Sequence, residues 1–305
     1  MRLLLTGAFG YLGGRLATAW ARDGFEVVLS GRRRPASAAW AQAFEVRLGD
    51  VTAPRDVAML TDGVDAVVQL ASLDEHEAAA DPARALAVSA EATGALLDAS
   101  ANSGVSRFVF FSTYHVYSPR PGEPIDELTA TSPTHPYAVA HLAGERMCIE
   151  HGTLDAVVLR VTNGYGAPMT SDVDRWTLAH NDFCRQAVRD GRIVLKTAGS
   201  QHRDFVWVED VAHATALVLL ATASELQPVY NLGGEASRSI ASVAELVRAR
   251  AQDRLGRPIR LDRPPKTERT ETPVHYSIER LKHLGFTPSD AMTEETDRLL
   301  ALLVA

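Results

Sequence analysis

Cysteine is scarce in this chain, and the two that are present, Cys148 and Cys184, match no metal-binding or redox spacing. We therefore expect ordinary buried thiols, a reducing compartment and a cytoplasmic location. None of the 10 histidines forms an HExxH pair or clusters with cysteine, so we expect no metal site.

The chain also lacks an excess of basic residues, because 31 Lys and Arg stand against 38 Asp and Glu, which gives a net charge of −7. A nucleic-acid-binding surface usually carries a basic excess, so we expect no nucleic-acid partner. No apolar run approaches the roughly 20 residues that span a bilayer. Arg2 is followed at once by a strand-like run, so we expect no secretory signal and no membrane partner. The remaining composition, 46% hydrophobic and 23% charged, is typical of a soluble globular protein.

Short apolar runs alternate with longer amphipathic segments in the first half of the chain. Near-continuous apolar runs are typical of parallel strands that are covered on both faces. The helical segment over 81–103 begins with Asp81, a candidate N-cap, and Pro82 at the first helical position. This alternation predicts a doubly wound, parallel α/β sheet of the Rossmann type with right-handed crossovers. The strand-like runs are RLLLTG, FEVVLSG, FEVRLGD, DAVVQLAS, RFVFFST and DAVVLRVT.

After about Thr162 the alternation loosens, and segments with glycine and proline separate the later helices. We expect residues 1–163, with 204–230 returning to them, to form a dinucleotide-binding domain. We expect residues 164–203 and 231–305 to form a small C-terminal α/β lid that binds the substrate.

The stretch LLLTGAFGYLGG places three glycines directly after the first strand and at the opening of a helix. Gly7 permits the tight turn, Gly10 lets backbone amides approach a pyrophosphate, and Gly13 allows close packing of helix and strand. The pattern predicts a dinucleotide cradle, and glycines needed only for packing are the alternative. We expect three further residues of this turn to contact the cofactor: Phe9, Tyr11 and Leu12.

The end of the second strand bears on which dinucleotide is bound, because a carboxylate there would bind the adenosine ribose of NAD. This chain has Ser30 followed by Gly31, Arg32, Arg33 and Arg34. A hydroxyl with guanidinium groups suits the extra phosphate of NADP, so we expect NADP in preference to NAD. The alternative is a solvated basic turn. Further cofactor contacts are expected where the third and fourth strands end, from Asp50, Val51, Leu70, Ala71 and Ser72.

Several motifs resemble a known family, the extended short-chain dehydrogenase/reductases, also called the NAD-dependent epimerase/dehydratase family of sugar-nucleotide enzymes. TGAFGYLGG is similar to the family's TGxxGxxG, and PYAVAH stands in the place of its YxxxK. LRVTNGYGAP resembles LRPxNVYGP, RDFVWVEDVA resembles RDFVHVxDVA, and YNLGG resembles YNVG. The resemblance runs over nearly the whole chain.

The resemblance implies a hydroxyl–tyrosine–lysine set beside the nicotinamide. Thr113 takes the hydroxyl role, and Tyr137 takes the acid/base role as a hydride moves at the same carbon. The family's lysine lowers the pKa of the tyrosine and grips the nicotinamide ribose, but here its place is taken by His141. Three interpretations remain open: a working substitute, which we favour, a site that has lost the usual redox chemistry, or a histidine on the helix surface without a role.

The resemblance also bears on the reaction and on the substrate. In the family's 4,6-dehydratases an Asp-Glu pair follows the threonine, whereas Tyr114 and His115 follow it here, which favours a ketoreductase or an epimerase. His115 is expected to be a general acid or to orient the substrate, and a buried structural histidine is the alternative. By resemblance we also expect substrate contacts from Ser72, Tyr114, Asn163, Arg203 and Lys266, with Arg269 as an alternative to Lys266.

Three functions therefore remain for the structure to address. The first is an NAD(P)-dependent oxidoreductase or epimerase that acts on a nucleotide-linked sugar or a related hydroxy or keto compound. The second is a reductase of a non-sugar, specialised-metabolite ketone, and the third is a regulatory protein that binds the cofactor without turnover. The resemblance also implies a homodimer, formed by the helix over 81–103 and the helix that carries Tyr137.

Overall fold

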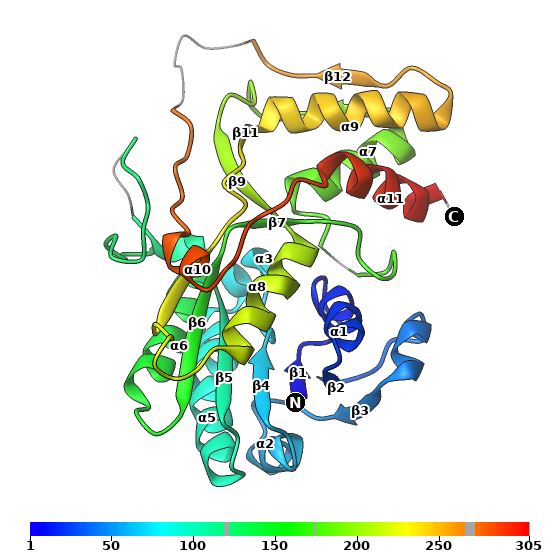
Figure 1. The fold of residues 1–305 in the computed structure, drawn as a ribbon. Helices are drawn as coiled ribbons and strands as arrows, with labels where there is room; N and C mark the ends of the chain where they lie inside the picture. Colours follow the sequence, from blue (N-terminus) through cyan, green and yellow to red (C-terminus); the bar gives the residue numbers. More distant parts are fainter. Residues whose placement is uncertain (119–121, 174, 266–271, 305) are drawn as a thin grey trace.

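The computed structural model describes residues 1–118, 122–173, 175–265 and 272–304. Figure 1 shows a central sheet with helices on both faces and a group of helices and short strands at one end. The sheet has seven strands in the order β10-β6-β5-β4-β1-β2-β3, and every pair is parallel. The expected doubly wound parallel sheet is confirmed. Its strands are β1 Arg2–Thr6, β2 Glu26–Gly31, β3 Glu45–Leu48, β4 Ala66–Gln69, β5 Arg107–Thr113, β6 Asp155–Val161 and β10 Val229–Leu232.

The strands of the sheet are apolar along their length because helices cover both faces. In β1, Leu4 packs in the cluster that includes Leu60 and Leu96, whereas Leu3 packs in the opposite cluster with Trp20. The Trp20 indole donates a hydrogen bond to the Ala212 carbonyl at 2.9 Å, which joins α1 to α8. The helices around the sheet are α1 Gly13–Arg22, α2 Pro54–Thr61, α3 Glu75–Ala80, α6 Pro136–Glu150, α8 Val208–Leu220 and α10 Glu279–His283, with the short η1 Ala39–Ala43 and η3 Tyr114–Val116.

The helix expected over 81–103 is present. Asp81 caps it by accepting a hydrogen bond from the Arg84 amide at 3.0 Å, and Pro82 opens it. The middle is a π-helical turn rather than regular α-helix. The successive segments are α4 Pro82–Leu86, η2 Ala87–Glu91 and α5 Ala92–Asn102.

The C-terminal helices gather at one end of the sheet, at the top of Figure 1. They share a separate buried cluster that includes Phe183, Val247 and Leu299. A three-stranded sheet in the order β11-β9-β7 connects this group to the large sheet, and β10 extends past the expected boundary at residue 230. The elements are β7 Asn163–Tyr165, α7 Ala179–Asp190, β8 Arg192–Val194, β9 His202–Trp207, β11 Ser237–Ser239, α9 Ile240–Leu255, β12 Arg260–Asp262 and α11 Met292–Val304. Within the described ranges, no helix combines the length and the apolar composition that crossing a bilayer requires.

A buried ionic network joins the first helix of the sheet to the last helix of the chain. The Arg15 guanidinium lies 2.7 Å from a carboxylate oxygen of Glu209 and 2.8 Å from one of Glu295. The other oxygen of Glu295 accepts a hydrogen bond from the Ala167 amide at 2.8 Å. Glu295 therefore ties together α1, α11 and the segment that follows β7.

We expect replacement of Glu295 by alanine to lower the free energy of unfolding by about 3 kcal/mol. The change leaves the Ala167 amide and part of the Arg15 charge buried without a partner, and such unpaired buried groups destabilise the folded state. Urea unfolding followed by circular dichroism measures the loss. The matched control is Glu294→Ala, an exposed position in the first turn of the same helix, for which we expect a change within about 0.5 kcal/mol. Equal losses in the two variants would contradict the prediction.

Candidate active site

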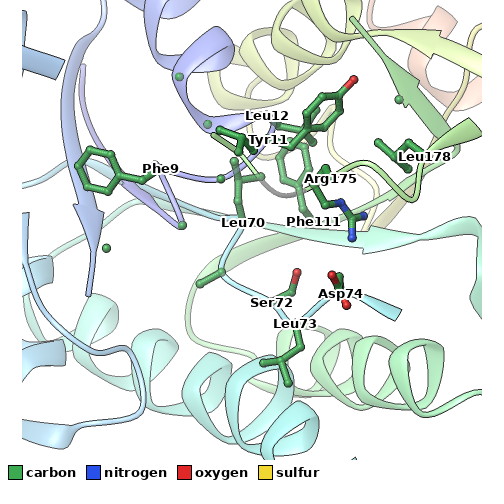
Figure 2. A pocket seen from close by; sticks show the side chains of 18 of the residues that line it. Phe9, Tyr11, Leu12, Leu70, Ser72, Leu73, Asp74, Phe111, Arg175 and Leu178 are labelled. Carbon is green, nitrogen blue, oxygen red and sulfur yellow. The ribbon is translucent and has the colours of Figure 1, made fainter. Parts of the chain in front are cut away.

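A cavity of about 1100 Å³ runs along the carboxyl ends of the central strands. It extends from the glycine turn after β1 to Tyr137 on α6, and a segment of the C-terminal region that includes Arg175 and Leu178 forms its other wall. Figure 2 shows Phe9 toward one end, and Arg175 extending its guanidinium in the direction of Ser72 and Asp74. This is the edge of an open α/β sheet at which ligands usually bind.

The glycine turn leaves no room for side chains at two of its positions. Gly7 has φ +68°, and a Cβ there would lie 2.7 Å from the Ala71 nitrogen. A Cβ on Gly13 would lie 2.3 Å from the Ala8 carbonyl oxygen. The backbone therefore passes directly against the end of β4 and presents the start of α1 to the cavity, as a dinucleotide cradle requires.

Most of the expected cofactor contacts line this cavity, and a few do not. The Tyr11 hydroxyl is committed to the structure, since it donates to the Gly166 carbonyl at 2.6 Å. The expected cofactor contacts that line the cavity are Gly7, Phe9, Gly10, Tyr11, Leu12, Gly13, Arg32, Arg33, Leu70, Ala71, Ser72, Tyr137 and His141. Ser30, Asp50 and Val51 are outside the cavity lining that the described residues form.

The two polar residues outside the lining have different surroundings. Ser30 is 1% exposed, and its hydroxyl has no hydrogen-bond partner among the described residues. The Asp50 carboxylate accepts hydrogen bonds from the Thr52 amide at 2.9 Å and the Thr52 hydroxyl at 2.7 Å, and these bonds hold the pKa of Asp50 below its usual value. Asp50 is thus engaged in the turn after β3.

Thr113 and Tyr137 meet at one end of the cavity. Thr113 ends β5, and its hydroxyl accepts a hydrogen bond from the His115 amide at 3.2 Å. The Thr113 hydroxyl proton is not used in this bond, and Thr113 favours the ionised form of the Tyr137 phenol. Burial, followed by the nearby Glu75 carboxylate, raises the pKa of Tyr137 to about 12, while Arg175 and Thr113 act in the opposite direction.

His141 lies on the same helix as Tyr137 and packs against its ring, with 4.3 Å between the ring centroids. It is 3% exposed, which contradicts the interpretation as a histidine on the helix surface. Its Nδ1 lies 2.8 Å from the Tyr137 carbonyl oxygen, and because that oxygen can only accept, Nδ1 carries the proton. Burial lowers the pKa of His141 to about 4, so the ring is neutral near pH 7 and its Nε2 is an acceptor.

His115 is exposed at the cavity wall, which contradicts the interpretation of a buried structural histidine. Its ring lies 4.1 Å from the ring of Tyr114 and 6.4 Å from that of Tyr137, measured between centroids. A second cavity of about 410 Å³ adjoins the first, and His115, Tyr137 and Glu75 line both.

The expected substrate contacts divide into three groups. Ser72, Tyr114 and Asn163 line the cavity, and the Asn163 amide group also donates to the Asp204 carbonyl at 2.8 Å. Arg203 is outside the lining that the described residues form, and its guanidinium donates to the neighbouring His202 carbonyl at 2.9 Å. Lys266 and the alternative Arg269 lie outside the described residues.

Glu75 and Arg175 are cavity residues that sequence reasoning missed. Glu75 opens α3, whose capping box at Asp74 and Glu77 is a recognisable local signal. Arg175 lies 100 positions further along the chain, and its Nη1 contacts the Glu75 carboxylate at 3.1 Å. No local pattern connects two residues so far apart.

A family model described as the NAD dependent epimerase/dehydratase family matches residues 3–233. A UDP-glucose 4-epimerase of Azospirillum brasilense is 30% identical over 238 residues, which cover 72% of this chain and 68% of that protein. A dTDP-glucose 4,6-dehydratase of Streptomyces niveus is 27% identical over 265 residues, 81% of this chain and 76% of that protein. The match to an uncharacterized UDP-glucose epimerase of Bacillus subtilis, 28% identical, spans 63% of this chain but only 60% of that protein's length.

Solved structures of similar proteins share the fold of this chain. The protein RMD from Pseudomonas aeruginosa, complexed with NADPH, is 25% identical and superposes with a TM-score of 0.80 over 99% of this chain and 98% of that one. A UDP-glucuronic acid 4-epimerase from Bacillus cereus in complex with NAD, 21% identical, shares the fold with a TM-score of 0.83 over 100% and 99% of the two chains. Fold and matches define the class of protein as that of the NAD-dependent epimerases and dehydratases. The chain belongs to the NAD-dependent epimerase/dehydratase family, and the resemblance seen in its motifs is confirmed.

Proposed function

We propose that this protein is an NAD(P)-dependent epimerase or ketoreductase of nucleotide-linked sugars, with Tyr137 as the acid/base. The observation that carries the proposal is that the hydroxyls of Thr113 and Tyr137 meet in the same cavity as the glycine turn. The relatives named above as epimerases and dehydratases of UDP-glucose and dTDP-glucose support a nucleotide sugar as the substrate.

The chemistry divides between the cofactor and the chain. When bound along the glycine turn, the nicotinamide cofactor supplies the hydride acceptor or donor. Thr113 orients the substrate oxygen, and Tyr137 takes or gives its proton. The neutral His141 keeps part of the family lysine's role by accepting a hydrogen bond from a cofactor hydroxyl at Nε2, but it supplies no positive charge at neutral pH.

A dehydratase is the less suitable proposal. Elimination of water needs an acid and a base beside the reacting carbons. The residues directly after Thr113 are Tyr114 and His115, neither of which is a carboxylate, and the Glu75 carboxylate is paired with Arg175. These observations favour hydride transfer at a single carbon, as in an epimerase or a ketoreductase.

Turnover of a panel of substrates tests the proposal. Purified protein is mixed with NAD or NADP in either redox state and with UDP- and dTDP-linked hexoses, and products are followed by cofactor absorbance and chromatography. Conversion of at least one nucleotide sugar is expected. Turnover of a non-sugar ketone alone would favour the specialised-metabolite reductase, and cofactor binding without any turnover would favour the regulatory protein.

We expect Arg32→Ala to weaken NADP binding by about 10- to 100-fold and to leave NAD binding unchanged, because one charge-assisted hydrogen bond to the extra phosphate is lost. Arg32 is exposed and lines the cavity, together with Arg33 and Arg34. Fluorescence titration with both cofactors measures the dissociation constants. Arg189→Ala, which removes a 79% exposed guanidinium outside the cavity lining of the described residues, is the control. Equal affinities for the two cofactors throughout would remove the case for NADP.

We also propose a homodimer in the cytoplasm. Helix α6 exposes three apolar side chains, with Val139 38%, Met147 41% and Ile149 48% accessible. Met147 lies against α5, where its sulfur would be 3.7 Å from a Cβ on Gly94. Exposed apolar side chains on α6, beside α5, are the support for an interface between two copies.

A further inference from the structure

One ion pair crosses the cavity beside Tyr137. The Arg175 Nη1 lies 3.1 Å from a carboxylate oxygen of Glu75, and the two side chains are 23% and 34% exposed. Both line the main cavity, together with Tyr137. A partly exposed pair of this kind contributes little to stability, about 0–1 kcal/mol, so its position at the reacting end of the cavity suggests a different role.

The positive charges along this cavity lie in two places in the sequence. Among the described lining residues, the arginines are Arg175 and the triplet 32–34, and lysine does not occur. The triplet follows Gly31, where a Cβ would lie 2.8 Å from the Phe9 ring. Arg175 instead lies opposite Ser72 and Asp74 in Figure 2. Arg175 is therefore the guanidinium placed to act on Tyr137.

The histidine at position 141 makes this placement consequential. A family lysine there would hold an ammonium beside the phenol, but His141 is neutral and its Nδ1–H is committed to the Tyr137 carbonyl. Tyr137 has thus lost its usual cationic neighbour on α6. Arg175 favours the tyrosinate, and Glu75 opposes it.

We propose that the Glu75–Arg175 pair controls the acidity of Tyr137 in place of the missing lysine, with Arg175 stabilising the tyrosinate and Glu75 holding the phenol protonated. Both are positioning residues, since they act through Tyr137. The importance of the pair for turnover rests on the proposed function, whereas its effect on Tyr137 does not.

Other side chains besides Glu75 and Arg175 act on or contact Tyr137. Asp74, at the cap of α3, adds a weaker effect of the same sign as Glu75. His115 faces the phenol ring edge-on from η3, and His135 accepts a hydrogen bond from the Tyr137 amide at 3.3 Å. Thr113, at the end of β5, favours the tyrosinate but carries no charge. Among the described residues that surround Tyr137 in this way, Arg175 is the one that carries a permanent positive charge.

The test measures the ionisation of Tyr137 directly. Protein labelled with ¹³C at the tyrosine Cζ is titrated by NMR, and the Tyr137 signal is assigned by its absence in Tyr137→Phe. We expect Glu75→Gln to lower the pKa of Tyr137 by about 1 unit and Arg175→Met to raise it by a similar amount. This amount is at the lower end of the pKa shifts that a neighbouring charge causes. Arg175→Lys keeps the charge and is expected to restore behaviour close to wild type.

The control is Arg189→Met, which removes the same charge from an exposed site outside the described cavity lining and is expected to change nothing. Circular dichroism at each pH checks whether each variant is folded. If Arg175→Met does not fold, the test depends on Glu75→Gln, which keeps the shape of the side chain. An unmoved Tyr137 ionisation in Glu75→Gln would overturn the inference.

The pH profile of turnover separates this inference from the proposed function. Oxidation needs the tyrosinate, so the acid limb of the profile is expected about 1 pH unit lower in Glu75→Gln and higher in Arg175→Met. A shifted NMR titration without turnover of any nucleotide sugar would contradict the proposed function alone. Turnover of a nucleotide sugar with an unchanged Tyr137 titration would contradict only the inference that Glu75 and Arg175 set the acidity of Tyr137.

Discussion

Replacing Tyr137 by phenylalanine is expected to reduce kcat/KM by about 10²- to 10⁴-fold, the usual contribution of a positioned proton carrier. The Tyr137 side chain lines the cavity with Thr113, and its ring packs on His141 with 4.3 Å between centroids. The phenylalanine ring keeps the contact with His141 and removes only the oxygen. We therefore expect cofactor affinity and the free energy of unfolding to change little while turnover falls. Initial rates measured by cofactor absorbance, with cofactor titrations alongside, check this result.

The matched control is Tyr230→Phe. Tyr230 is fully buried in β10, and its hydroxyl accepts a hydrogen bond from the Gln227 amide at 2.8 Å, outside the cavity lining of the described residues. Loss of that hydroxyl is expected to cost about 1 kcal/mol of stability and no turnover. Near-full turnover of Tyr137→Phe would refute the acid/base assignment and leave the fold untouched.

The sheet could be predicted from sequence because its signals are local. Each strand that is covered by helices on both faces needs a continuous apolar run, and Leu3, Leu4 and Leu5 illustrate it by filling clusters on opposite sides of β1. The glycine turn is equally local, since the Gly7 conformation and the contact between Gly13 and Ala8 arise within a few residues. The same holds for Asp81 and Pro82 at the start of α4.

The electrostatics of the site could not be predicted from sequence, because they depend on contacts between distant segments. Glu75 and Arg175 meet only after the C-terminal region has folded over the sheet. The expected phosphate contact at Arg203 depends on alignment with a motif, and the bond of its guanidinium to the adjacent carbonyl of His202 is a contact that the motif does not predict. Burial is also a property of the folded chain, so the neutral state of His141 followed only from its 3% exposure, which lowers its pKa.

The replacement His141→Lys restores the family pattern and is expected to produce the second large effect. An ammonium beside the Tyr137 phenol favours the tyrosinate and lowers the phenol pKa by about 1–3 units. Oxidation of the substrate needs the unprotonated phenol, so its rate rises with pH until Tyr137 is ionised. The acid limb of the pH profile therefore moves to lower pH in the variant, and oxidation at a fixed pH below that limb becomes about 10- to 1000-fold faster.

The control for this variant is His151→Lys, the same chemical change at the C-terminal end of α6, where His151 lies 3.3 Å from the Asp98 carboxylate and outside the described cavity lining. Its pH profile is expected to match the wild type. An unchanged profile in His141→Lys would show that position 141 does not tune Tyr137. Suppose that the pH profile shifts in His141→Lys but not in Glu75→Gln. The acidity of the Tyr137 phenol would then depend on residue 141 of the same helix and not on the Glu75–Arg175 ion pair, which acts on Tyr137 from other elements.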